Sequence, residues 1–319
     1  MKVTFWGTRG SLPAPLSGRR VREKIVNALV KGADKGLDSI EKASRFCDEA
    51  LSFAESSTFG GNSSCVQIDT GGAEYLLCDL GSGVREFSLA ALAKHGPAQP
   101  QVYNILLSHV HWDHIMGFPF FVPAFIPGNR IRMHSCHPMV ERAIRGQNSA
   151  PCFPVEYSYL AASIEFVHME PGVAYEIAGA MVTGTAQVHG NDSYGYRIEK
   201  DGKTVVYSTD SEHKLENLDD TKKVVGLFRD ADLVIFDAMY SLAEASSVKE
   251  DWGHSSNITG VELSQMAGVK HLCLFHHEPI HDDAKIESIY QETLRFEEIT
   301  RTGEQLTVSS AYDGLVIEV

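Results

Sequence analysis

Several features of other protein classes are missing from this sequence of 319 residues. No apolar run reaches the roughly 20 residues that a membrane-spanning helix needs. Met1-Lys2 leads straight into a strand-like segment and not into a signal peptide. The six cysteines are scattered, form no Cys-x-x-Cys pair, and in several cases lie in apolar runs, as buried thiols in a reducing compartment do. We therefore expect a soluble, cytoplasmic protein with no membrane partner.

Positive charge is also scarce. The chain has 28 Lys and Arg residues against 42 Asp and Glu residues, a formal net charge of −14. This balance repels nucleic acid at long range and argues against a nucleic-acid partner. A loose basic cluster remains, and we interpret it as a solvated face rather than a binding patch. It consists of Arg130, Arg132, Arg142 and Arg145.

The chain shows no internal repeat and no linker rich in Pro, Gly or Ser. Its hydrophobic content of 43% is ordinary for a globular protein, so we expect one domain spanning 1–319. Short apolar strands alternate with helical segments in both halves, which predicts a mixed α+β fold. Residues 20–55 differ, because their apolar residues recur at mostly helical spacing, and we predict two or three amphipathic helices broken near Gly32 and Gly36.

Residues 108–114 read Ser-His-Val-His-Trp-Asp-His and follow the short apolar segment 103–107. His109 and His111 are two positions apart, so in an extended segment they project to the same side. Asp113 and His114 come where the chain must turn. Imidazoles with a carboxylate suit zinc and, less selectively, manganese or iron. The loop thus offers ligand pairs for two adjacent metal sites, a more specific pattern than a chance cluster of solvated histidines.

The run His-x-His-x-Asp-His after an apolar strand resembles the signature of the metallo-β-lactamase fold superfamily. Further segments resemble its subgroup related to ribonuclease Z and cyclic-nucleotide phosphodiesterases. They are 5–13, 60–65, 79–83, 207–210, 253–256 and 275–279. The resemblance implies a four-layer αββα sandwich. Residues from about 19 to 57 are an apparent helical insertion, which we expect to form a cap over or beside the metal cleft and to restrict which substrates enter.

Three further candidate ligands each end an apolar strand. His189, Asp210 and His276 are ordinary structural residues when each is taken alone. The resemblance implies one metal held by His109, His111 and His189, and a second held by Asp113, His114 and His276, with Asp210 as the bridge. Alternation along the strand does not distinguish His276 from His277, and the resemblance favours His276.

His254 lies in a Gly-His-Ser turn ahead of a predicted helix, outside the ligand set. In ribonuclease Z-like members, a His in a matching context lies near the leaving group, so the resemblance implies that His254 is a general acid. A surface or supporting His is the plainer alternative. Asp237 ends another apolar strand, where it either orients the imidazole of a metal ligand or simply terminates the strand.

These residues predict a hydrolase with two divalent metal ions, zinc by preference and manganese or iron as alternatives. We expect a metal-bridging hydroxide, oriented by Asp113, to attack a phosphodiester of a small or cyclic nucleotide. Three alternatives stay open: a ribonuclease Z-like RNA endonuclease, an ester, lactone or thioester hydrolase, and a metal-binding scaffold without turnover. A homodimer also stays open.

Overall fold

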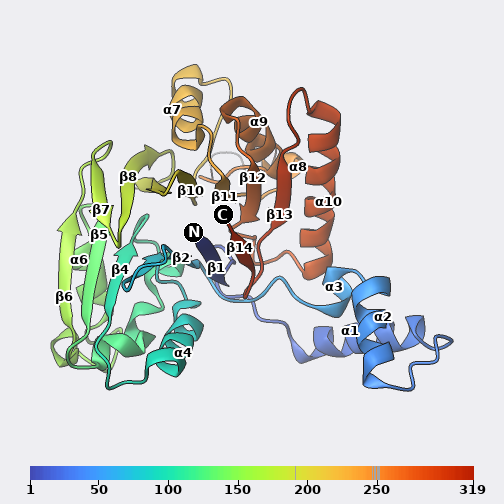
Figure 1. The fold of residues 1–319 in the computed structure, drawn as a ribbon, viewed down its shortest axis with the longest axis horizontal. Coiled ribbons are helices and arrows are strands. Elements are labelled where there is room, and N and C mark those ends of the chain that lie inside the picture. The colour runs from blue at the N-terminus through green and yellow to red at the C-terminus, as the bar shows by residue number, and fades with distance from the viewer. Residues whose placement is uncertain (191, 246, 248, 250–251) are drawn as a thin grey trace.

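Two seven-stranded sheets form the centre of the molecule (Figure 1). The structure, a computed structural model, describes residues 1–190, 192–245, 247, 249 and 252–319. In spatial order, the first sheet contains β14 (Val316–Glu318), β1 (Lys2–Gly7), β2 (Cys65–Asp69), β3 (Tyr75–Cys78), β4 (Val102–Leu106), β5 (Arg130–Ser135) and β6 (Ser163–His168). The second contains β13 (Thr307–Ser310), β12 (His271–Phe275), β11 (Leu233–Asp237), β10 (Lys203–Ser208), β9 (Ser193–Lys200), β8 (Ala180–Gln187) and β7 (Ala174–Ile177).

Helices cover the outer face of each sheet. The first sheet packs against α4 (Val84–His95), η1 (Phe118–Phe120), η2 (Val122–Phe125) and α6 (Val140–Gln147). The second packs against α7 (Leu218–Phe228), α9 (Asn257–Ala267) and α10 (Asp283–Thr300). Shorter elements are α5 (Trp112–Ile115), η3 (Tyr157–Tyr159) and α8 (Leu242–Ala245). None of the described helices is both long and apolar enough to cross a membrane.

The main hydrophobic core lies between the two sheets. Phe5 and Leu106 from the first sheet meet Tyr196, Tyr207 and Phe275 from the second, and all five are fully buried. Alternation along each strand explains this, because one face of a strand points inward while the other meets the helices. The order of layers is therefore helix, sheet, sheet, helix, and the predicted αββα sandwich is confirmed.

The parallel strands bring chemically active residues to one edge of the sandwich. In the first sheet, β3 and β4 run parallel with Cys78 opposite Leu106. In the second, β10, β11 and β12 run parallel, with Ser208 opposite Phe236 and Asp237 opposite Phe275. Because the carboxyl ends of parallel strands meet at the same edge, the residues that follow each strand collect there.

Residues 18–56 form the three helices α1 (Gly18–Lys31), α2 (Ile40–Ala50) and α3 (Phe53–Ser56), as their amphipathic pattern predicts. They lie beside the amino-terminal end of α10 (Figure 1). Lys24 forms an ion pair with Asp283, and the Ser52 Oγ donates to Glu287 Oε2 at 2.7 Å. Ala54 of α3 also packs with Phe59 and with Ile286 of α10 in a small apolar cluster, whereas none of the residues of α1 and α2 is buried.

Candidate metal centre

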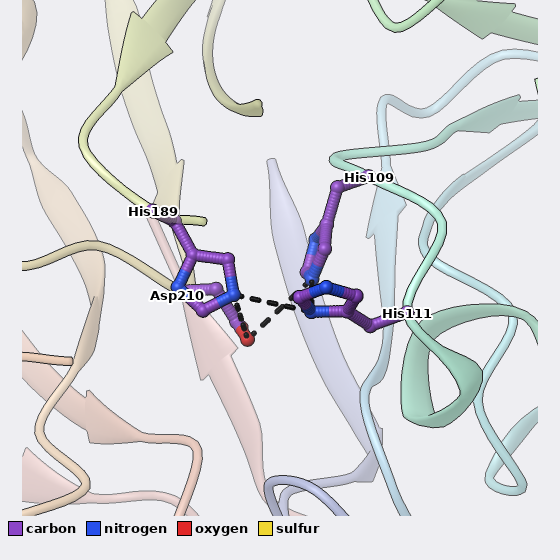
Figure 2. A group of neighbouring side chains, drawn as sticks. All are labelled: His109, His111, His189 and Asp210. Carbon is purple, nitrogen blue, oxygen red and sulfur yellow. Dashed lines mark hydrogen bonds and ion pairs between the residues drawn. The ribbon is translucent and has the colours of Figure 1, made fainter. Parts of the chain in front are cut away.

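The first group of potential ligands joins both halves of the chain. His109 and His111 lie in the loop after β4, whereas His189 follows β8 and Asp210 follows β10. Their ring nitrogens and carboxylate converge on one point (Figure 2). His111 Nδ1 lies 3.0 Å from His109 Nε2 and 3.1 Å from His189 Nε2. Asp210 Oδ2 lies 3.6 Å from His109 Nε2 and 3.7 Å from His189 Nε2.

The second group shares Asp210 with the first. Asp210 Oδ1 lies 3.1 Å from both His114 Nε2 and His276 Nε2. Asp113 Oδ2 is also 3.1 Å from each of these two nitrogens. One carboxylate oxygen of Asp210 therefore faces each group, as a bridging ligand requires. The structure brings together all seven residues that the sequence singled out as ligands.

The donor set fits divalent metal ions. Ligand atoms about 2.0–2.2 Å from one tetrahedral zinc ion are roughly 3.3–3.6 Å apart, close to the separations in both groups. The far nitrogens of two rings are already bonded: His189 Nδ1 to the Gly253 carbonyl at 2.7 Å, and His114 Nδ1 to Asp79 Oδ2 at 2.7 Å. If these nitrogens carry the protons, each Nε2 keeps a lone pair directed at its group.

Charge at this centre favours a bound cation. Burial would raise the pKa of Asp210, but the His114 and His276 imidazoles hold it well below its usual range. Burial would lower the pKa of His276, but Asp210, Asp113 and Asp237 raise it to about 10. The buried carboxylates thus favour protonation of His114 and His276, whereas burial lowers the pKa of His109 and His111. Divalent ions supply the same positive charge and replace those protons.

Asp79 is a site residue that sequence reasoning missed. It is fully buried after β3, and its Oδ2 accepts from His114 Nδ1 at 2.7 Å, Ser108 Oγ at 2.8 Å and Tyr207 Oη at 2.8 Å. Its Oδ1 accepts from Ser108 N at 2.8 Å. Asp79 therefore fixes the orientation of a ligand imidazole. The sequence contains a signal for this role, because Asp79 follows an apolar strand as the ligands do. In the sequence, the segment 79–83 indicated only the resemblance to the superfamily.

The backbone at three strand ends adopts an uncommon conformation. Asp79, Asp210 and His276 have φ values of 59°, 36° and 62°. L-residues seldom adopt positive φ, and such strain gathers at functional sites because the surrounding structure must hold it. Gly10 packs tightly here as well, since a Cβ at this position would lie 2.6 Å from the His276 ring. Any side chain at position 10 would displace His276.

His254 and Asp237 form a hydrogen-bonded pair next to the second group. His254 Nδ1 lies 2.8 Å from Asp237 Oδ2, and Asp237 also accepts from Ser211 N at 3.0 Å. The His254 ring stacks on His276 with centroids 5.2 Å apart. Burial opposes protonation, but Asp237 outweighs it and raises the pKa of His254. Asp237 does more than terminate its strand, because it bonds to His254 and its Oδ1 also lies 3.7 Å from Nδ1 of the candidate ligand His276.

Neighbouring residues take other roles. His277 Nε2 bonds to the Ala311 carbonyl at 2.8 Å, and burial together with Arg9 lowers the pKa of His277 to about 3, so His276 and not His277 joins the ligand group. The backbone N–H groups of Gly61 and Asn62 donate to Asp313 Oδ2, each at 3.0 Å. The loop at 60–64 is therefore a turn held by the protein's own carboxylate.

Two cavities reach residues of the site. One of about 590 Å³ is lined by His109 and His111, and another of about 320 Å³ is lined by His254. No residue of 19–57 lines either of these two cavities, and a cap over or beside the cleft stays a prediction. These residues instead border a separate cavity of about 480 Å³ together with α10.

Comparison with known proteins agrees with this geometry. A family model described as the beta-lactamase superfamily domain matches residues 74–277. The chain belongs to this superfamily. This chain is 25% identical over 228 residues to a ribonuclease Z from Geobacillus kaustophilus. The aligned region covers 57% of this chain and 72% of that protein. The predicted superfamily, and the likeness to ribonuclease Z within it, are therefore confirmed.

Solved structures share the fold at low identity. The metallo-beta-lactamase fold protein YhfI from Bacillus subtilis is 17% identical with a TM-score of 0.63, over 99% of this chain and 98% of that one. A diphosphatase from the PhnP family is 20% identical with a TM-score of 0.59, over 100% and 97% of the two chains. These likenesses establish the architecture and leave the substrate open.

Proposed function

We propose that this protein hydrolyses phosphodiester bonds of small or cyclic nucleotides, using two divalent metal ions. The observation that carries the proposal is the pair of ligand groups sharing Asp210, with the His254–Asp237 pair beside them. The seven ligands would be His109, His111, Asp113, His114, His189, Asp210 and His276. Zn²⁺ suits this imidazole and carboxylate set, and Mn²⁺ or Fe²⁺ are alternatives. When bound, the ions supply Lewis acidity and an activated water.

The remaining chemistry belongs to side chains of this chain. Asp113 Oδ2 accepts from Ser11 N at 2.7 Å, which fixes the carboxylate that would orient the attacking water. An alkoxide leaving group needs a proton. His254 would supply it, because Asp237 accepts at Nδ1 and the raised pKa of His254 favours its protonated form. The ring's Nε2 is then the proton donor.

A ribonuclease Z-like endonuclease is the second candidate. Relatives of this chain carry that name, so the expectation that nucleic acid is an unlikely partner finds no support. The basic cluster offers few unpaired arginines to bind the phosphates of an RNA. Arg132 pairs with Glu74 and Glu165, and Arg145 pairs with Glu141. Pairing of these two arginines reduces the positive charge of that face, so an RNA backbone would gain less from it.

A substrate panel tests the proposal. Metal-reconstituted protein would be assayed with cyclic nucleotides, dinucleotides, a precursor transfer RNA, lactones and thioesters. We expect the highest kcat/KM with a cyclic nucleotide or dinucleotide, strongly reduced in His254→Ala and retained in His168→Ala, which changes an exposed His at the end of β6. Preference for the transfer RNA would favour the nuclease, and preference for a lactone or thioester would favour that class. Bound metal without any hydrolysis would favour the scaffold. The cytoplasmic location and the homodimer stay predictions.

A further inference from the structure

The cavity beside the first ligand group has the size and lining of a small-molecule site. Its volume of about 590 Å³ lies within the range of roughly 300–1,000 Å³ that ligand pockets occupy. His109 and His111 form one side of it. Val110 and Met139 add apolar surface, as such pockets usually have. A substrate whose reacting group lies at the metal ligands could therefore extend its other end into this cavity.

Arg142 lies in the first turn of α6 and lines the same cavity. Two other arginines of the basic cluster already contact neighbouring side chains. Arg132 forms ion pairs with Glu74 and Glu165, while the Arg145 guanidinium lies 4.2 Å above the centre of the Tyr157 ring. Among the described residues, Arg142 has no acidic partner and no side-chain hydrogen bond, so its guanidinium is free to bind an anionic group.

The cavity also contains one carboxylate. Asp192 lines it, yet no ion pair joins Asp192 to Arg142 among the described residues. A cation and an anion that remain separate in one pocket can each select a different part of a ligand. A guanidinium matches the geometry of a phosphate, with paired N–H donors. A carboxylate accepts hydrogen bonds from sugar hydroxyls or from the amino group of a base.

We propose that Arg142 binds a second phosphate of the substrate, beyond the one that is cleaved. This role of Arg142 rests on the proposed function and narrows its substrate class. The substrates would be phosphodiesters with an additional terminal phosphate, such as a 5′-phosphorylated dinucleotide. The cleaved phosphate lies at the metal ligands, the nucleoside occupies the cavity, and the terminal phosphate meets Arg142. Asp192 accepts from the nucleoside. An unphosphorylated dinucleotide makes every contact except the one to Arg142.

Kinetics with a matched substrate pair test this assignment. The metal-reconstituted protein would be assayed with the dinucleotides pApA and ApA, which differ by one terminal phosphate. The ratio of their kcat/KM values should favour pApA by on the order of 10- to 100-fold, as expected for hydrogen bonds to a charged group. In Arg142→Ala the ratio should fall to near one, and Arg142→Lys should retain part of it. Arg145→Ala is the control on the same helix and should keep the original ratio. An unchanged ratio in Arg142→Ala overturns the proposal.

Binding measurements separate this proposal from the proposed function. Calorimetry would compare adenosine 3′-monophosphate with adenosine 3′,5′-bisphosphate on the same metal-reconstituted proteins, because the two ligands differ only in the 5′-phosphate that Arg142 would bind. The second phosphate should tighten binding about 10-fold or more in the original protein and should give no gain in Arg142→Ala. If neither dinucleotide is cleaved, the proposed function fails while this comparison still decides the role of Arg142. Equal gains in both proteins, or no gain in either, contradict that role.

Discussion

Replacing Asp79 by Asn tests whether buried hydrogen bonds orient the metal ligands. The Asp79 Oδ2 accepts from three donors, on Ser108, His114 and Tyr207, and its Oδ1 accepts from the Ser108 backbone. An amide keeps only one acceptor oxygen, so at least one N–H or O–H must face the new NH₂ group. Each unsatisfied buried donor costs about 1–3 kcal/mol. Asn tolerates positive φ, so the backbone at position 79 can stay as it is.

The loss should appear in metal binding. His114 loses its orienting carboxylate, so affinity for the ion at the Asp113, His114 and His276 group should fall about 10- to 100-fold. A competition titration against a chromophoric chelator measures this, with Asp69→Asn as the control. Asp69 is the exposed last residue of β2, and among the described residues only Gly71 N donates a hydrogen bond to its carboxylate. If the Asp79→Asn protein binds both ions as tightly as the original protein and has the same Tm, Asp79 does not orient His114.

Three further outcomes are expected. His254→Ala should lower kcat by about 10²–10⁴ for esters with poor leaving groups and much less for a nitrophenyl ester, with metal content unchanged; equal losses would instead indicate substrate positioning. Chelation should lower the Tm, and added metal should restore it in a concentration-dependent way, because the ions bind the folded state; an unaltered Tm would argue against bound metal. Burial would raise the pKa of Glu244, but its hydrogen bonds to Ser241 and His281 lower this pKa from 4.5 to about 2. The ionised carboxylate therefore stabilises the fold above pH 4.5, and this stabilisation is lost as the pH falls towards 2. Denaturation of Glu244→Gln should therefore show a deficit of about 1 kcal/mol near pH 6 that shrinks in acid, and a deficit independent of pH would exclude this cause.

The ligand set could be predicted from the sequence because its members share one local signature. Each follows a short apolar strand, as His189, Asp210 and His276 do, or belongs to the run at 108–114. Asp79 shares the strand-end position, but its role depends on the parallel pairing of β3 with β4, which brings it beside Ser108. The pairing of Asp237 with His254 depends in the same way on tertiary structure. Periodicity within one segment does not contain this information.

Edge strands and the outer helices show a second limit. The strands β13 and β14 could not be predicted, because TVSS is short and mostly polar and the three residues of VIE are too few to give an alternating pattern. The amphipathic pattern of 20–55 predicted helices but not their orientation. Ile25 and Leu29 of α1 are 55% and 67% exposed, whereas Lys24 points to Asp283 of α10. Periodicity identifies an apolar face and leaves open what that face meets.

The number of metal ions per chain tests the central claim most directly. The protein would be purified without chelators, reconstituted, freed of loosely bound ions and analysed for metal by elemental analysis. Two ligand groups that share Asp210 predict a value close to two equivalents per chain. A firm value of one or less after reconstitution would contradict the dinuclear centre and the phosphodiester chemistry built on it.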